Sequence, residues 1–252
     1  MKYIASCSFG KDSIATVILA HINKEPLDII VYSEVMFDEK ISGEHPLHRD
    51  FIYNKAIPTF ESWGYKVKVV RSEKMNYIKS FYKIVTRART KERNGKMRGF
   101  LVPFGCVMNS NCKVQPIKDF YKTQNMNEVI QYIGIAIDEP KRLERLNDNK
   151  ISLLQKYKYT EKMAYKLCED YNLLSPIYQH FTRGGCWFCP NARDKELLFL
   201  KQNYPELWQK LLDLPKDNLA NARFNRIETF EELDKRLQIK IDNEKLQLKL
   251  FN

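Results

Sequence analysis

The chain has 252 residues, enough to bury a full hydrophobic core, and we expect one α/β domain with appended segments. Its formal net charge of +11 favours polyanionic partners such as nucleotides or nucleic acid, although a basic solvated surface accounts for the same excess. No stretch approaches the roughly 18 apolar residues of a membrane helix, and the N-terminus enters an apolar segment without the pattern of a secretory signal, so we expect a cytoplasmic protein with no membrane partner.

The N-terminal stretch predicts a strand, a tight turn and a helix. An apolar run at residues 3–7 leads into a loop and then into a helical pattern that begins near residue 14. Such a turn aims backbone N–H groups and the positive end of the helix at one small volume, which suits a phosphate. The loop also supplies two hydroxyls, one lysine and a glycine that permits close approach, in the order Ser8, Phe9, Gly10, Lys11, Asp12, Ser13. It is not a Walker A loop, because no G-x-x-x-x-G-K-S/T occurs.

The next elements continue an alternating α/β pattern. Residues 27–32 read as a buried parallel strand, residues 46–63 as a helix and residues 65–70 as a third strand. In a doubly wound sheet, ligands bind at the carboxyl ends of the strands. Glu34 and Asp38 follow the second strand and could therefore hold Mg²⁺ or a ribose hydroxyl, or be ordinary loop carboxylates.

A basic stretch follows the third strand. Aromatic residues 77, 81 and 82 precede a run of cations, and this combination suits phosphate backbones and stacked bases. A solvated surface or a lid over the nucleotide would have the same composition. The candidate nucleic-acid contacts are Arg87, Arg89, Lys91, Arg93, Lys96 and Arg98.

Four of the six cysteines form two pairs. Cys106 and Cys112 lie in a turn-rich segment before a predicted helix at residues 116–124, and Cys186 and Cys189 form a Cys-x-x-Cys knuckle after two glycines. Cytoplasmic cysteines are more often metal ligands or catalytic groups than structural disulfides. Four thiolates suit a [4Fe–4S] cluster or, alternatively, a tetrahedral Zn²⁺ site, and a redox pair is a further reading of the knuckle.

The remaining pattern is mainly helical. A strand is expected at residues 129–137, an extended segment at 173–178, and helices at 159–171, 194–203 and 205–214. Thr160 is the expected N-cap of the first of these helices, and Thr229 starts a capping box before a charged amphipathic C-terminus.

The Ser-x-Gly-x-Asp-Ser loop resembles the PP-loop of the N-type ATP pyrophosphatases and of the phosphoadenosine phosphosulfate (PAPS) reductase group. Glu139 and Arg142 match the acidic and final basic positions of a second motif in that group, whereas Ala136 replaces its first arginine. The two cysteine pairs also resemble the cluster layout of cluster-bearing PAPS reductase relatives and of the sulfur-inserting proteins of DNA phosphorothioation. The reductases' C-terminal nucleophilic cysteine is missing, because no cysteine follows Cys189.

The resemblance implies a doubly wound, mostly parallel sheet of the adenine nucleotide alpha hydrolase type. We expect a nucleotide-binding α/β domain at residues 1–145 and a mainly helical, cysteine-bearing region at 146–252 that packs on it. The implied activity is cleavage of ATP between the α- and β-phosphates, with Mg²⁺, to adenylate an acceptor and support sulfur transfer from a sulfur donor protein. Two alternatives are a PAPS or APS reductase that uses an external thiol and a non-enzymatic nucleotide- or nucleic-acid-binding protein.

In this scheme Lys11, Asp12 and Arg142 are the catalytic candidates, and Cys106, Cys112, Cys186 and Cys189 are the metal ligands. The expected nucleotide-binding residues are Ser8, Phe9, Gly10, Lys11, Asp12, Ser13, Glu34, Asp38, Glu139 and Arg142.

Overall fold

The computed structural model describes residues 1–88, 90–102 and 105–250. Its main sheet has five parallel strands in the order β3-β2-β1-β5-β6. These strands are β1 (Lys2–Ser6), β2 (Ile29–Ser33), β3 (Lys66–Val70), β5 (Val129–Ile133) and β6 (Lys150–Ile151). A second, small sheet pairs β4 (Met97–Gly99) with β7 (Leu219–Asn221). The predicted α/β fold with a parallel sheet is confirmed.

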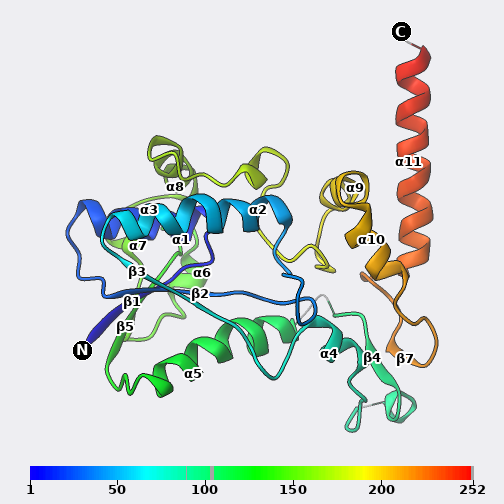
Figure 1. Cartoon of the computed structure of the whole chain (residues 1–252), viewed down its shortest axis with the longest axis horizontal. Helices are drawn as coiled ribbons and strands as arrows, with labels where there is room; N and C mark the ends of the chain where they lie inside the picture. Colours follow the sequence, from blue (N-terminus) through cyan, green and yellow to red (C-terminus); the bar gives the residue numbers. More distant parts are fainter. Residues whose placement is uncertain (89, 103–104, 251–252) are drawn as a thin grey trace.

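Helices cover both faces of the main sheet. Figure 1 shows α1 and α3 on one face, with α8 beyond them, and α5 on the other. Both α7 and α8 pack against α1. The helices are α1 (Lys11–Ile22), α2 (Pro46–Phe51), α3 (Ile57–Ser62), α4 (Tyr77–Tyr82), α5 (Gln115–Thr123), α6 (Pro140–Leu143), α7 (Leu153–Lys156), α8 (Glu161–Asp170), α9 (Asp194–Asn203), α10 (Pro205–Leu212) and α11 (Phe230–Leu250). The chain order reverses between β1 and β5, so the crevice outside their carboxyl ends is the expected ligand position of a doubly wound sheet.

Two hydrophobic cores interleave along the sequence. The first lies around α1 and the main sheet and includes Leu153, Leu154 and Cys168 from beyond residue 145. The second joins the knuckle region to the C-terminal helices and includes Val35 and Phe37 from the segment after β2. The predicted domain boundary at residue 145 therefore does not coincide with the division between the cores.

Three predicted elements differ in detail from the structure. The helix at 46–63 contains a π-helical segment, Ile52–Ala56, just before Pro58, which has no N–H to donate to a regular α-helical turn. The strand expected at 129–137 ends at Ile133, because the chain turns at Gly134 against the N-terminal loop. The segment expected to be extended at 173–178 includes a 3₁₀ helix, Pro176–Gln179.

The predicted helix starts are confirmed. The Thr160 hydroxyl accepts from the Met163 N–H at 3.2 Å, and Thr229 and Glu232 form the reciprocal bonds of a capping box before α11. Figure 1 shows α11 running away from the sheet at the edge of the molecule. In the part of the chain that the structure describes, no helix has the length and apolar character needed to cross a membrane.

Candidate functional site

A cavity of about 490 Å³ lies where β1 gives way to α1. It brings together side chains from both halves of the sequence. Four cations, four carboxylates and several small polar groups surround it: Ser8, Gly10, Lys11, Asp12, Glu44, His48, Lys113, Glu139, Arg142, Glu161, Tyr178, Thr182, Arg183, Gly184 and Gly185. Four of these are loop residues predicted to bind or act on the nucleotide, and Glu139 and Arg142 bring the predicted residues to 6 of the 15. This overlap makes the cavity the candidate site.

The loop places the amino end of α1 at the cavity. Phe9 has a φ of 58°, a left-handed conformation that is uncommon for a non-glycine residue, and its ring is buried in the first core. Phe9 therefore anchors the turn through its side chain, and only its backbone faces a ligand position. The Ser13 hydroxyl donates to the Gly10 carbonyl at 3.0 Å, which holds the turn closed. The Lys11 N–H donates to the Tyr178 hydroxyl at 2.9 Å.

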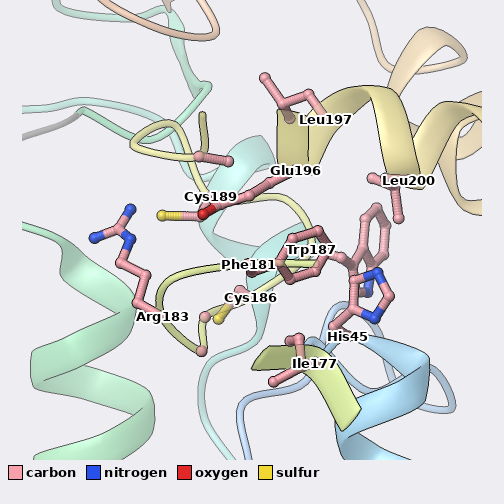
Figure 2. A pocket seen from close by; sticks show the side chains of 13 residues that line it. His45, Ile177, Phe181, Arg183, Cys186, Trp187, Cys189, Glu196, Leu197 and Leu200 are labelled. Atoms are coloured by element: carbon pink, nitrogen blue, oxygen red, sulfur yellow. The ribbon is translucent and has the colours of Figure 1, made fainter. Parts of the chain in front are cut away.

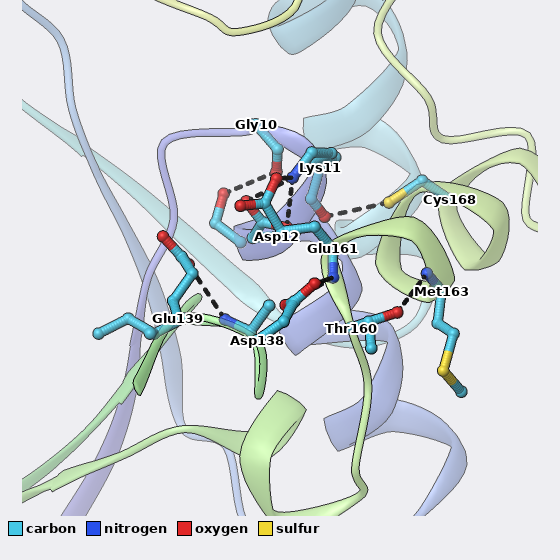
Figure 3. A network of polar contacts seen from close by, with 12 residues as sticks. Gly10, Lys11, Asp12, Asp138, Glu139, Thr160, Glu161, Met163 and Cys168 are labelled. Atoms are coloured by element: carbon cyan, nitrogen blue, oxygen red, sulfur yellow. Dashed lines mark hydrogen bonds and ion pairs between the residues drawn. The ribbon is translucent and has the colours of Figure 1, made fainter. Parts of the chain in front are cut away.

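Lys11 lies between two carboxylates (Figure 3). Its Nζ is 2.8 Å from Asp12 Oδ1 and 2.7 Å from Glu161 Oε2. Burial by itself would lower the pKa of Lys11, but the hydrogen bonds to Asp12 and Glu161 outweigh it and raise the pKa. Burial raises the pKa of Asp12, the bond to Lys11 opposes this, and the charges of Glu161 and Glu139 add to the rise. A cation arriving beside Asp12 would relieve this crowding of negative charge.

The second predicted motif reaches the same cavity. Arg142 Nη1 donates to Glu139 Oε1 at 2.5 Å, and the other Glu139 oxygen accepts from the Ala136 N–H. Gly134, at the end of β5, lies directly behind the loop. A β-carbon there would lie 2.7 Å from the Asp12 carbonyl carbon and the Ser13 nitrogen, so only glycine allows this approach.

Glu34 and Asp38 do not line this cavity. The Glu34 side chain is fully buried, and its oxygens accept hydrogen bonds from Arg49, Tyr53 and Arg71. Burial would raise the pKa of Glu34, but hydrogen bonds from its neighbours and the Arg71 charge lower it. Asp38 Oδ1 accepts the backbone N–H groups of residues 40 and 41 within its own loop. Both carboxylates have intramolecular partners in place of a nucleotide.

Several cavity residues were missed by the sequence reading. Glu44, just before α2, is 5% exposed, and His48, within α2, is 2% exposed. His48 Nδ1 lies 2.9 Å from the Ser175 hydroxyl, and its Nε2 lies 3.2 Å from the Ser8 carbonyl oxygen, so it links the loop to the segment before Tyr178. The signal that could have located them is their position after the carboxyl end of the second strand.

The four cysteines predicted as metal ligands lie in one region around Lys113. Burial alone would lower the pKa of Lys113, but the charges of Glu44, Cys186, Cys106 and Cys189 raise it, so these groups share one neighbourhood. Burial raises the pKa of the Cys186 and Cys189 thiols.

Burial and the Cys106 charge raise the pKa of the Cys112 thiol, and the Lys113 charge opposes them. This thiol also donates to the Met75 carbonyl oxygen at 3.3 Å within the second core. Across residues 1–88, 90–102 and 105–250, no group of three or more His, Cys, Asp or Glu side chains is arranged to hold a metal ion.

A second, small cavity of about 30 Å³ adjoins the knuckle (Figure 2). His45 and Glu196 line it, and neither His45 ring nitrogen has a hydrogen-bond partner among the described residues, nor has Glu196 Oε1. The rings of Phe181, Phe199 and Tyr204 pack around the His45 imidazole. Burial lowers the pKa of His45 to about 4, so this imidazole is neutral at physiological pH.

The predicted nucleic-acid contacts lie on the segment around β4. Arg87, Lys91 and Arg93 are exposed, whereas Lys96 and Arg98 are partly buried. Arg89 lies outside the described residues. Two of the three aromatic residues expected to stack on bases, those at 77 and 81, are buried in the second core, so only the ring at position 82 is exposed.

The comparisons with known proteins find distant similarity. No protein-family model matches the chain. Two proteins of Methanocaldococcus jannaschii are similar. The uncharacterized protein MJ0973 is 27% identical over 125 residues, which cover 43% of this chain and 28% of that protein. The uncharacterized protein MJ0066 is 22% identical over 215 residues, which cover 81% of this chain and 39% of that protein. The chain thus spans well under half the length of these relatives.

Among solved structures, the U34-tRNA thiolase NcsA from Methanococcus maripaludis, with its [4Fe-4S] cluster, aligns with 94% of this chain and 81% of its own, at a TM-score of 0.41 and 15% identity. These similarities do not assign the chain to a family. The fold class rests on the observed sheet order, and the functional proposal rests on the residues of the cavity.

Proposed function

We propose that the protein binds Mg-ATP in the 490 Å³ cavity, cleaves it between the α- and β-phosphates to adenylate an acceptor, and supports sulfur transfer to that acceptor. The observation that carries the proposal is the meeting of the loop, the amino end of α1, Lys11 and Arg142 in one cavity at the switch point of the sheet. N–H groups at a helix start and nearby cations together favour a polyphosphate.

The residues divide the chemistry between them. An acceptor oxygen attacks the α-phosphorus, a new O–P bond forms, and the bond to the bridging oxygen breaks, so that pyrophosphate leaves with the electron pair. The loop N–H groups, Lys11 and Arg142 stabilise the charge that develops on the leaving pyrophosphate. Mg²⁺ typically takes one or two protein carboxylates plus phosphate oxygens, and Asp12 is the carboxylate we assign to it.

Cysteine thiolates are suitable ligands for an iron–sulfur cluster or zinc, but the four thiols do not converge on one point among the described residues. Cys106, Cys186 and Cys189 would hold an iron–sulfur cluster or a zinc ion, while Cys112 would have to turn away from Met75 to become a fourth ligand. A bound cluster would supply a sulfide-binding iron or a staple between segments.

Nucleic acid is the acceptor we favour. The exposed cations Arg87, Lys91 and Arg93 lie on a part of the chain that protrudes beside the small β4–β7 sheet, and the chain as a whole carries a net charge of +11. Contacts of this type bind phosphate backbones through counterion release and weaken steeply with salt. A sulfur donor protein completes the set of partners in this proposal.

The test is to incubate the protein with Mg-ATP and cellular RNA or DNA and to measure pyrophosphate and AMP. Pyrophosphate release that depends on nucleic acid and falls at least about tenfold in Lys11→Met supports the proposal. Lys2→Met is the matched control, because Lys2 is an exposed lysine that pairs with Asp28 away from the cavity. Bound ATP without pyrophosphate release would favour the non-enzymatic alternative, and turnover of PAPS or APS with thioredoxin would favour the reductase.

A further inference from the structure

The Tyr178 hydroxyl is the hydrogen-bond partner of a backbone N–H in the phosphate loop. It accepts the Lys11 N–H at 2.9 Å, and it lies 3.2 Å from the point where a β-carbon on Gly10 would stand. The N–H groups at the start of an α-helix have no partner within the helix and are the groups that bind a phosphate oxygen. An anion that takes the Lys11 N–H must therefore displace the Tyr178 hydroxyl.

The backbone after Tyr178 leads directly to the cysteine knuckle. Residues 179–185 connect Tyr178 to Cys186 and carry Arg183, which lines the cavity and whose charge lowers the pKa of the Cys189 thiol against the larger effect of burial. In Figure 2 the side chains of Arg183 and Cys189 extend to the same side of this segment.

The connecting segment is held at both ends, and in its middle Phe181 packs on His45 and Phe199 while Arg183 donates to the Asn191 carbonyl oxygen. At its far end, the Trp187 N–H donates to the Gly43 carbonyl at 2.9 Å and its indole N–H donates to the Ser42 carbonyl at 2.9 Å. At its near end, Tyr178 holds the loop. Between these points, a β-carbon on Gly185 would meet nothing within 4 Å, and one on Gly184 would meet only His48 Nε2, at 3.9 Å. The part of the segment with open space beside its backbone is therefore Gly184 and Gly185, next to the knuckle.

We propose that Tyr178 is a positioning residue that couples phosphate occupancy of the loop to the segment bearing Cys186 and Cys189. With the loop vacant, Tyr178 satisfies the Lys11 N–H and adds a restraint at the start of residues 179–185. A nucleotide polyphosphate takes that N–H, frees the Tyr178 hydroxyl and loosens the segment at Gly184 and Gly185, between Arg183 and the knuckle. This inference rests on the proposed function, because it requires a phosphate in the cavity.

The test uses inorganic pyrophosphate as the probe and compares the full-length wild type with Tyr178→Phe and Tyr165→Phe. The Tyr165 ring contacts the Tyr178 ring with centroids 6.1 Å apart, so Tyr165→Phe is a matched loss of one hydroxyl from the same ring pair. Two quantities are measured: the pyrophosphate Kd by calorimetry, and the hydrogen-exchange rate of backbone amides in residues 179–190 with and without pyrophosphate.

One intramolecular hydrogen bond competes with the ligand, so Tyr178→Phe should bind pyrophosphate about two- to tenfold more tightly than the wild type, and Tyr165→Phe should match the wild type. Pyrophosphate should speed exchange in residues 179–190 by a similar factor, about two- to tenfold, in the wild type and in Tyr165→Phe. In Tyr178→Phe the exchange should already be fast and should not respond.

Two results would overturn the coupling, and only the second would also overturn the proposed function. Equal pyrophosphate affinity in all three proteins, with exchange that does not respond in the wild type, would remove the role of Tyr178 and leave the proposed function standing. Failure of pyrophosphate to bind to any of the three would remove both the coupling and the proposed function.

Discussion

Gly134 is the position where a single methyl group should disable the loop. It follows β5, and its backbone lies directly against the first turn of α1. A β-carbon there would lie 2.7 Å from the Asp12 carbonyl carbon, 2.7 Å from the Ser13 nitrogen and 2.8 Å from the Asp12 carbonyl oxygen. These are backbone atoms of a helix start, which cannot move aside as a flexible side chain can, so the clash in Gly134→Ala must shift either the loop or β5.

The expected magnitude follows from this geometry. Overpacking in a well-packed interior costs about 1–3 kcal/mol, and the absence of a yielding side chain places Gly134→Ala toward the upper end. A displacement of the loop by a fraction of an ångström also misaligns the phosphate donors, so we expect pyrophosphate binding to weaken by about tenfold or more. Urea unfolding gives the first quantity, and calorimetry with pyrophosphate gives the second.

Gly185→Ala is the control for stability. A β-carbon at Gly185 would meet nothing within 4 Å, so its free energy of unfolding should stay within about 0.5 kcal/mol of the wild type. If Gly134→Ala unfolds at the same urea concentration as the wild type and binds pyrophosphate equally well, this result would contradict the claim that the loop requires glycine at position 134.

Three further predictions concern other buried groups. Because the pKa of His45 is lowered to about 4, the unfolded chain binds a proton at a higher pH than the folded chain as the pH falls. This residue should therefore lower the free energy of unfolding by about 3 kcal/mol between pH 7 and pH 4. Urea unfolding of His45→Leu at both pH values should lack this part of the loss. Arg71→Met should destabilise the fold by about 1–3 kcal/mol in urea unfolding, because it leaves the fully buried Glu34 carboxylate with fewer partners. Adding Glu34→Gln should recover part of that loss. If the losses in the two single variants simply add in the double variant, the pairing of Arg71 with Glu34 is contradicted. Cys186→Ser should lower the iron or zinc content measured by elemental analysis, whereas Cys112→Ser should change it little, since the Cys112 thiol donates to the Met75 carbonyl; equal loss in both would argue for a four-cysteine site.

The fold class and the strand, turn and helix at the N-terminus could be predicted because their signals are local. The alternation of apolar strands and amphipathic helices gave the α/β class, and Thr160 and Thr229 marked helix starts through side-chain bonds that span only three residues. Glu139 and Arg142 also reached the predicted cavity, since parallel strands bring their carboxyl ends to one edge.

The rest of the site depends on contacts between distant segments. Lys113, Tyr178 and Arg183 face the loop only because the second core folds the knuckle region back over the end of the sheet. Glu34 shows the reverse case, because its place after a strand suggested a ligand, whereas cations from two other segments had already paired with it. Neither outcome is visible in sequence spacing.

The most direct test of the central claim is titration of Mg-ATP into the wild type and into Asp12→Ala, with pyrophosphate as competitor. If the cavity is a nucleotide site, the wild type binds one ATP per chain, pyrophosphate displaces it, and Asp12→Ala binds at least about tenfold more weakly. ATP binding that pyrophosphate does not displace and that Asp12→Ala does not weaken, or no ATP binding at all, would contradict the assignment of the loop as a phosphate cradle.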